Sequence, residues 1–262
     1  MAYEQQYLAL LTKVRTAPLR ETRNGAVHSF FGARIECPNV AEQFPLLTSK
    51  RVWMKGVMEE LAWFLRGSTN VQELRDVGVH IWDLNVPGED AGPIYGYQWR
   101  NFGGSGYDQV AEMLRLLRED PTSRRMFLSA WCPPQLADMA LPPCHVSYQF
   151  YVDEAGRVCC QTYQRSCDVF LGLPFNMASA ASLVLLVAAA VGKPPGSVAL
   201  CLGDVHLYQI HEAAADQQLA NNTSTPPTAS VTRVSQDLLD VKRTDIRVEG
   251  YTHAGRINAP MC

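Results

Sequence analysis

The chain has 262 residues, enough to bury a sizeable core in one large domain or two small ones. Hydrophobic residues make up 47% and charged residues 19%, which are ordinary globular proportions and exclude a disordered, collagen-like or coiled-coil chain. The formal net charge of −3 at pH 7 argues against a broad nucleic-acid-binding surface and leaves room only for a local basic pocket.

Helical and strand-like patterns are mixed in the first half of the chain. Apolar residues recur on one helical face over residues 3–16, and again over 52–66 and 108–119. Residues 26–36 instead have the aromatic and apolar content of a strand. Because helices and strands do not alternate strictly, the order favours an α+β fold.

The second half contains one hairpin pattern and one long apolar helix. Strands over 146–152 and 157–163 flank the turn residues 153–156. Residues 177–191 form an uncharged helix shorter than the roughly 20 residues that span a bilayer, so we expect a buried core helix and no membrane partner. The remaining expected elements are strands over 198–202 and 246–251 and a surface loop over 220–231.

The N-terminal residues and the cysteines bear on the cellular compartment. The segment MAYEQQYLALLTKVR mixes acidic, amide and basic residues in an amphipathic pattern, unlike a targeting segment. The eight cysteines lack paired CxxC spacing. We therefore expect reduced thiols in a cytoplasmic protein, folded as a single domain over residues 1–262 with a largely buried sheet.

Several familiar sites are missing from the sequence. It has no GxGxxG, P-loop, HExxH or GxSxG motif, and no Cys/His cluster at zinc spacing. We therefore expect no metal. Three other local groups of polar residues could carry chemistry.

The first group is Leu141-Pro142-Pro143-Cys144-His145. Two prolines restrict the backbone before a cysteine that opens a strand, which would present one thiol rigidly. The alternative is a buried structural cysteine after a turn, because cysteine is among the most buried residue types. Spacing alone favours that alternative.

The second group runs from Tyr163 to Asn176 and the third is the pair Arg124-Arg125. In the second group, polar side chains interrupt an apolar run, so a ligand could be one of their partners; a satisfied internal network is the alternative. For the arginine pair, solvated surface charge is the usual explanation and an anion clamp is the minority one.

Across these groups the sequence resembles the thymidylate synthase family over nearly its whole length. The shared motifs are FPLLTSKRVWMKGVMEELAWFLRGSTN (44–70), IWDLN (81–85), GPIYGYQWR (92–100), DPTSRR (120–125), MALPPCH (139–145), QFYV (149–152), YQRSCDVFLGLPFNMAS (163–179), GDVHLYQIH (203–211) and EGY (249–251). The resemblance implies an α+β homodimer with large mixed sheets packed back to back and covered by helices. It also implies methylation of dUMP at C5, with 5,10-methylenetetrahydrofolate as co-substrate giving both carbon and hydride.

The resemblance implies catalytic roles for five residues. Cys144 matches the nucleophile that adds to C6 of uracil, and Arg165 supplies the positive neighbourhood that a thiolate requires. Glu60 matches the proton-handling carboxylate. Tyr95 and His145 belong to the surroundings of the thiol.

The resemblance also implies two sets of binding residues. The set for dUMP is Arg23, Arg124, Arg125, Ser166, Asp168, Asn176, His206 and Tyr208. The set for the folate is Lys50, Ile81, Trp82, Asn85, Asp168, Leu171 and Phe175. Within them, Asn176 reads the uracil amide edge, His206 and Tyr208 hold the 3′-hydroxyl, and the Arg124-Arg125 pair reaches the phosphate in the partner subunit.

Four segments depart from the family pattern. The usual RTGTGT loop is replaced by ETRNGA (21–26), where we assign the phosphate role to Arg23, and Cys132 stands where asparagine is expected. The segment 220–228 lacks the arginine that is usual in the family, and the segment 258–262 has a polar end. A looser C-terminal lid would admit water and give a dUMP hydroxymethylase, which makes 5-hydroxymethyl-dUMP and tetrahydrofolate. A catalytically silent nucleotide- or RNA-binding homologue is the alternative from another class.

Overall fold

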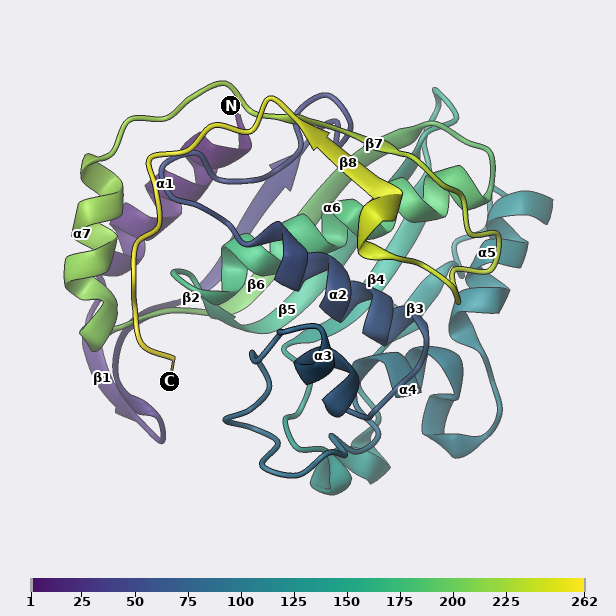
Figure 1. Ribbon diagram of the computed structural model, residues 1–262, viewed down its shortest axis with the longest axis horizontal. Helices are drawn as coiled ribbons and strands as arrows, with labels where there is room; N and C mark the ends of the chain where they lie inside the picture. Colours follow the sequence, from purple (N-terminus) through teal and green to yellow (C-terminus); the bar gives the residue numbers. More distant parts are fainter. Residues whose placement is uncertain (1, 262) are drawn as a thin grey trace.

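One mixed six-stranded sheet forms the centre of the computed structural model, which describes residues 2–261 (Figure 1). Its strands are β1 (Leu19–Thr22), β2 (Gly25–Cys37), β3 (Phe127–Ser129), β4 (His145–Val152), β5 (Val158–Asp168) and β6 (Pro195–Tyr208). The strand order is β1-β2-β6-β5-β4-β3; β5 and β6 run parallel, and the other neighbours are antiparallel.

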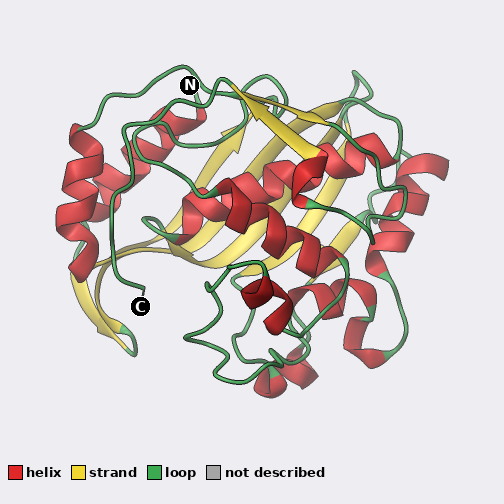
Figure 2. Ribbon diagram, viewed as in Figure 1, coloured by secondary structure: helices red, strands yellow, loops and turns green. Residues whose placement is uncertain are grey.

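Helices cover one face of this sheet, as Figure 2 shows. The α-helices are α1 (Tyr3–Arg15), α2 (Met54–Leu65), α3 (Gln72–Asp76), α4 (Tyr95–Arg100), α5 (Gln109–Glu119), α6 (Gly172–Ala190) and α7 (Glu212–Ala220). Helix α6 packs on β5 and β6, α1 packs on β2, and α2 lies over α6. The α+β fold with a large mixed sheet covered by helices is therefore confirmed.

Helix α6 is the buried core helix expected from the sequence. Within residues 2–261 it is the one helix long and apolar enough to cross a membrane, and 83% of its most apolar window is buried inside the protein. It begins at Gly172, five residues earlier than predicted. The Asp168 carboxylate accepts the N–H groups of Phe170 and Leu171 just before the helix, and Pro174 is tolerated in the first turn, which needs no N–H donor.

The central strands are longer than their apolar patterns predicted. Strand β5 runs to Asp168 rather than to residue 163, and β6 spans 195–208 rather than 198–202. Polar side chains end the apolar pattern at these positions, but the backbones keep pairing as far as Asp168 and His206. The extended ends of β5 and β6 therefore carry polar side chains into the site described below.

The opposite face of strands β3–β5 is exposed in this chain. Residues alternate along β4 and β5 between the helix-covered side and this open side. Phe127, Tyr151 and Tyr163 lie on the open side and are 45%, 57% and 42% exposed. Such large apolar side chains in one sheet face favour coverage by another surface.

The prediction of a surface loop over residues 220–231 is wrong for its last four residues. Strand β7 (Thr228–Val231) lies there and pairs with β8 (Ile246–Glu249), which ends two residues before the predicted strand. The segments between the other elements include the 3₁₀ turns η1 (Phe102–Gly104), η2 (Pro133–Asp138), η3 (Gln209–His211) and η4 (Arg243–Asp245). Strands β1 and β3 and helices α3, α4 and α7 had no counterpart among the predicted elements.

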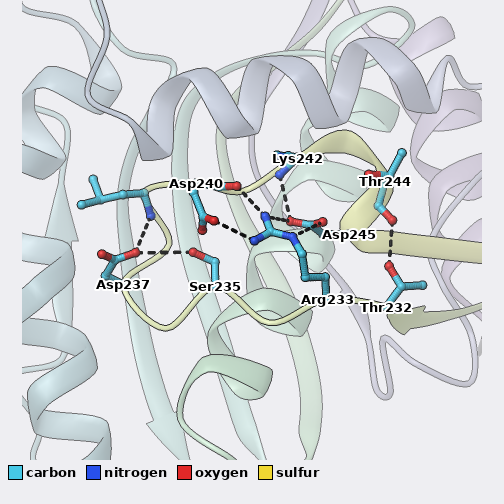
Figure 3. A network of polar contacts seen from close by, with 9 residues as sticks. Thr232, Arg233, Ser235, Asp237, Asp240, Lys242, Thr244 and Asp245 are labelled. Atoms are coloured by element: carbon cyan, nitrogen blue, oxygen red, sulfur yellow. Dashed lines mark hydrogen bonds and ion pairs between the residues drawn. The ribbon is translucent and has the colours of Figure 1, made fainter.

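The β7–β8 connection (residues 232–245) is held by one arginine (Figure 3). The Arg233 guanidinium donates to both oxygens of Asp245 at 2.9 and 2.7 Å and to Asp240 at 2.7 Å. Asp245 also accepts the N–H of Lys242 at 2.9 Å. This network closes the connection on itself, so that β8 returns beside β7.

Candidate active site

Cys144 lies directly before β4 on a backbone that two neighbours restrain. The Tyr95 hydroxyl oxygen accepts the N–H of Cys144 at 2.7 Å. The Arg165 guanidinium donates to the carbonyl oxygens of Pro142 and Pro143 at 2.7 and 2.8 Å. Arg165 is thereby held against the segment that carries the thiol.

Burial raises the pKa of the Cys144 thiol above its ordinary value. Three neighbours lower that pKa in part: the Arg165 charge has the largest effect, followed by the hydroxyl groups of Tyr95 and Ser166. In the chain without substrate, the effect of burial on this pKa exceeds the effects of the three neighbours, so Cys144 is a thiol at neutral pH. The positive neighbourhood expected from the sequence is present, but it does not by itself produce a thiolate.

Glu60 on α2 is a buried carboxyl group beside the same cluster. Trp82 donates its indole N–H to Glu60 Oε1 at 2.8 Å. Burial raises the pKa of Glu60 from 4.5 to about 7, against the opposing effect of the Trp82 hydrogen bond. Glu60 can therefore gain and lose a proton near neutral pH.

Aromatic rings connect the Glu60 side of the cluster to the thiol side. The ring centroids of Trp82 and Tyr95 are 6.1 Å apart, and those of Tyr95 and His145 are 5.5 Å apart. Burial lowers the pKa of His145 to about 4, so its imidazole is neutral at pH 7. The acid, the thiol and a neutral imidazole thus share one apolar wall.

A cavity of about 220 Å³ opens beside this cluster. It is lined by Arg20, Thr22, Arg23, Asn24, Val27, Ser166, Asp204, His206 and Tyr208. Four residues that the sequence assigned to dUMP therefore meet here, from the β1–β2 turn, β5 and β6. Because the Ser166 hydroxyl also lowers the pKa of Cys144, Ser166 links the cavity to the thiol.

Asn176 lies in the first turns of α6 and contacts a residue that the sequence analysis missed. Gln164 donates to Asn176 Oδ1 at 2.9 Å. Gln164 is buried, and its own Oε1 has no hydrogen-bond partner within residues 2–261. A buried amide with an unused acceptor beside Asn176 is suited to a ligand donor. The sequence signal that could have identified Gln164 is its position, as a polar residue, among the apolar residues of a strand.

Lys50 lies in the interior rather than at the surface. Its ammonium group donates to the Phe170 carbonyl oxygen and lies 3.5 Å from the centroid of the Phe170 ring. Burial lowers the pKa of Lys50 to about 7, although the Asp168 charge opposes this. Lys50 and Asp168 thus both contact the segment that leads into α6.

The other residues assigned to the folate lie outside the lining of the 220 Å³ cavity. Trp82 is buried, Ile81, Leu171 and Phe175 are half-buried against the core, and Asn85 is exposed. Of these side chains, Trp82 contacts Glu60 through its indole N–H.

Arg124 and Arg125 lie apart from the other predicted residues. They are exposed in the segment between α5 and β3 and line a different cavity of about 290 Å³ with Asp120, Thr122 and Ser123. Within one chain they do not meet Ser166 or His206. This placement agrees with the expectation that they act outside their own subunit, without testing it.

The departures from the family pattern have definite places in the structure. Thr22 pairs with Gly25, so Arg23 and Asn24 form the turn between β1 and β2, and Arg23 is exposed. Cys132 is buried before η2. Cys262 lies outside the described residues. In the described part of the chain, no group of three His, Cys, Asp or Glu side chains could hold a metal ion.

The fold and the site define an α+β protein with a half-buried thiol, a buried carboxyl group and a cationic cavity. The chain belongs to the thymidylate synthase family, whose model matches residues 5–262. It is 41% identical over 275 residues to the bifunctional dihydrofolate reductase-thymidylate synthase of Leishmania major, an alignment that covers 95% of this chain and 53% of that protein.

Two further relatives carry the same bifunctional name. The protein of Zea mays is 38% identical over 284 residues, covering 98% of this chain and 54% of the relative. That of Leishmania amazonensis is 41% identical over 275 residues, with coverage of 95% and 53%. The chain thus spans about half the length of the curated relatives it matches, and the family expected from the sequence is confirmed.

Proposed function

We propose that the chain is a thymidylate synthase, which converts dUMP and 5,10-methylenetetrahydrofolate into dTMP and dihydrofolate. The observation that carries this proposal is the meeting of Cys144 and Arg165 with the 220 Å³ cavity through Ser166. Membership of the thymidylate synthase family supports it. The folate supplies both the one-carbon unit and the hydride.

The first step falls to Cys144. Its thiolate adds to C6 of uracil, and the electron pair of the C5–C6 double bond moves toward C5 and O4, which makes C5 a nucleophile. Arg165 favours the thiolate, and substrate must bring the remaining stabilisation, because burial alone keeps the thiol protonated. Asn176 holds the N3–H and O4 edge on which the negative charge gathers.

The proton transfers fall to Glu60. After C5 bonds to the one-carbon unit, its own proton must leave, and O4 must gain and lose a proton as charge develops there. A carboxyl group with a pKa of about 7 can exchange protons in both directions at neutral pH. Loss of the C5 proton is coupled to cleavage of the bond between the one-carbon unit and tetrahydrofolate. Hydride transfer from tetrahydrofolate to that carbon, with release of Cys144 from C6, then completes the methyl group and leaves dihydrofolate.

Side chains that line the 220 Å³ cavity bind the nucleotide. Ser166 and Arg23 serve the phosphate, and His206 and Tyr208 serve the 3′-hydroxyl of the sugar. Asp168, whose Oδ1 already accepts two backbone N–H groups, presents its other oxygen to the pterin. Lys50 lies beside that position and serves the folate.

We propose that the partner is a second copy of this chain. The exposed face of β3–β5 carries Phe127, Tyr151 and Tyr163, which a back-to-back sheet would bury. Arg124 and Arg125 are exposed and separate from their own chain's cavity. In a homodimer they would complete the phosphate site of the other subunit.

The hydroxymethylase alternative requires the same residues and differs only in the entry of water. The named relatives carry synthase titles, and Trp82 is present and buried at the Glu60 side of the cluster. These observations favour the synthase. A silent nucleotide-binding homologue would bind dUMP without any exchange of the C5 proton.

Release of tritium from [5-³H]dUMP in the presence of methylenetetrahydrofolate tests the proposal. We expect wild-type protein to release tritium and Cys144→Ser to release none while it still binds dUMP. Cys159→Ser is the matched control, since Cys159 is half-buried at the far end of β5. Substantial release by Cys144→Ser would refute the nucleophile, and dUMP binding without release by wild type would refute the enzyme.

A further inference from the structure

Helix α1 carries a buried carboxylate that the proposed mechanism does not use. Glu4, in the first turn of α1, is 6% exposed. Its Oε1 accepts the N–H groups of Thr48 and Ser49 at 2.8 and 2.7 Å, and its Oε2 accepts the Thr48 hydroxyl at 2.6 Å. Hydrogen bonds to a carboxylate are among the stronger ones in proteins. Glu4 therefore fixes the start of residues 48–51, which we call the lysine segment.

The lysine segment is also held by the C-terminal part of the chain. The carbonyl oxygen of Thr48 accepts the N–H of Ala254 at 2.8 Å, and the N–H of Arg51 donates to the carbonyl oxygen of Gly255 at 2.7 Å. Lys50, which is 6% exposed, stands between these two contacts in the sequence. The backbone is therefore fixed on both sides of Lys50, which restricts where its ammonium group can lie.

Tyr7 makes a second contact from the same face of α1, one turn after Glu4. It is fully buried, and its hydroxyl group lies 3.1 Å from the carbonyl oxygen of Val169 and 3.3 Å from Gln218 Oε1. Val169 directly follows Asp168, the residue that we assign to the pterin. One face of α1 therefore contacts both backbone segments that carry the charged residues assigned to the folate.

We propose that Glu4 and Tyr7 are positioning residues for the folate, because together they set the separation of Lys50 and Asp168 before the folate binds. The proposal rests on the proposed function for the identity of this ligand. A site whose groups are already in place loses less conformational entropy when its ligand binds. Neither Glu4 nor Tyr7 lines the 220 Å³ cavity, so the binding of dUMP should not depend on them.

Calorimetric titration of dUMP-saturated protein with tetrahydrofolate tests the positioning, since this folate has no one-carbon unit to transfer. We expect Glu4→Ala to weaken tetrahydrofolate binding by about tenfold, the scale of one displaced hydrogen bond from a charged group, and to leave dUMP binding unchanged. Glu4→Gln keeps an oxygen for the N–H groups of Thr48 and Ser49 and should recover most of the loss. Asp245→Ala is the matched control: it removes another buried carboxylate with three hydrogen bonds, and it should lower stability but change neither affinity.

Two results of these titrations would overturn the proposal: wild-type affinity for tetrahydrofolate in Glu4→Ala, or equal losses for tetrahydrofolate and dUMP. Tyr7→Phe removes only a hydroxyl group and keeps the ring in the core, so it serves as the test if Glu4→Ala does not fold. It should weaken tetrahydrofolate binding by about threefold, the scale of one neutral hydrogen bond. An unchanged affinity would overturn the role of Tyr7.

Hydrogen exchange separates positioning from a general loss of stability and needs no ligand. In Glu4→Ala the amides of Arg51 and Ala254, which do not bond to Glu4, should exchange about tenfold faster, whereas Asp245→Ala should leave their exchange unchanged. Unchanged exchange in Glu4→Ala would overturn the proposal. Wild-type protein that binds dUMP but no tetrahydrofolate would instead defeat the proposed function, and faster exchange in Glu4→Ala would then still show that α1 holds the lysine segment.

Discussion

Glu60 shows how burial sets the chemistry of a single side chain. Its pKa is raised from 4.5 to about 7 by burial, so the folded chain keeps a proton that the unfolded chain loses above pH 4.5. The stabilising contribution of protonated Glu60 is therefore complete below pH 4.5 and is lost as the pH rises through 7. Ionisation of the carboxyl group that is suited to proton transfer thus lowers the free energy of unfolding at neutral pH.

Glu60→Gln should remove this pH dependence, because an amide does not ionise. Relative to wild type, the free energy of unfolding of the variant should rise by on the order of 3 kcal/mol between pH 4 and pH 8. The amide of the variant cannot shuttle a proton, so tritium release should fall as well. Urea unfolding curves at the two pH values measure the shift, and parallel pH profiles for both proteins would show that Glu60 is ionised at its ordinary pKa.

Asn176 is the residue that should decide between uracil and cytosine. Asn176→Asp replaces an amide donor with an acceptor when ionised, which suits the amino group of cytosine and opposes O4 of uracil. The affinity ratio of dUMP to dCMP should fall by about tenfold or more, the scale of one or two mispaired buried groups. Competition binding measures the ratio, and an unchanged value would mean that the base is read elsewhere.

Single residues differ in how far the sequence could predict them. Cys144, Arg165 and Ser166 lie in motifs of the family, and resemblance identified them although spacing alone favoured a structural cysteine. Arg20 lies in a four-residue strand whose side chains are all exposed, so no apolar pattern marked its direction. Its place in the cavity depends on pairing through β2 to β6, which no local pattern contains.

At the scale of elements, the burial of apolar side chains explains both the helices that were predicted correctly and the strands that were predicted too short. Helices α1, α2 and α5 were predictable because their apolar faces pack on the core, and α6 because it is buried all round. Strands β5 and β6 were cut short in the prediction, because their polar ends face a cavity rather than the core. The functional ends of strands are therefore the part that periodicity misses.

The β7–β8 connection should depend on its buried carboxylate. Asp245 has a 3% exposed side chain and accepts three hydrogen bonds, whereas Asp240 is 64% exposed, although both pair with Arg233. Asp245→Asn should lower the free energy of unfolding by about 2 kcal/mol. The matched Asp240→Asn should leave the free energy of unfolding close to that of wild type, because solvent screens an exposed ion pair. Equal shifts of the two urea midpoints would contradict this account.

At the scale of the whole molecule, the arginine pair decides whether the site is complete in one chain. Cys144→Ser and the double variant Arg124→Gln/Arg125→Gln should each be inactive or nearly so as homodimers. After mixing and subunit exchange, the mixed dimer should regain one working site, and total activity should reach about a quarter of wild type. Recovery requires that the arginines act across the interface.

A control mixture distinguishes this recovery from mere stabilisation. Cys144→Ser mixed with Glu60→Gln should recover nothing, because both residues belong to the site of their own chain. Arginine variants that fail to recover in the first mixture would show that Arg124 and Arg125 serve their own subunit. The exposed face of β3–β5 favours an interface, but one chain does not show which side chains of a partner enter the site, so this part of the site depended on resemblance.

The nature of the product tests the account most directly. Wild-type protein should be incubated with dUMP and methylenetetrahydrofolate, with the nucleotide followed by mass analysis and dihydrofolate measured in parallel. We predict dTMP with an equal amount of dihydrofolate, because the site transfers hydride to the new carbon. 5-Hydroxymethyl-dUMP without dihydrofolate would contradict the account and show that water reaches the same carbon first.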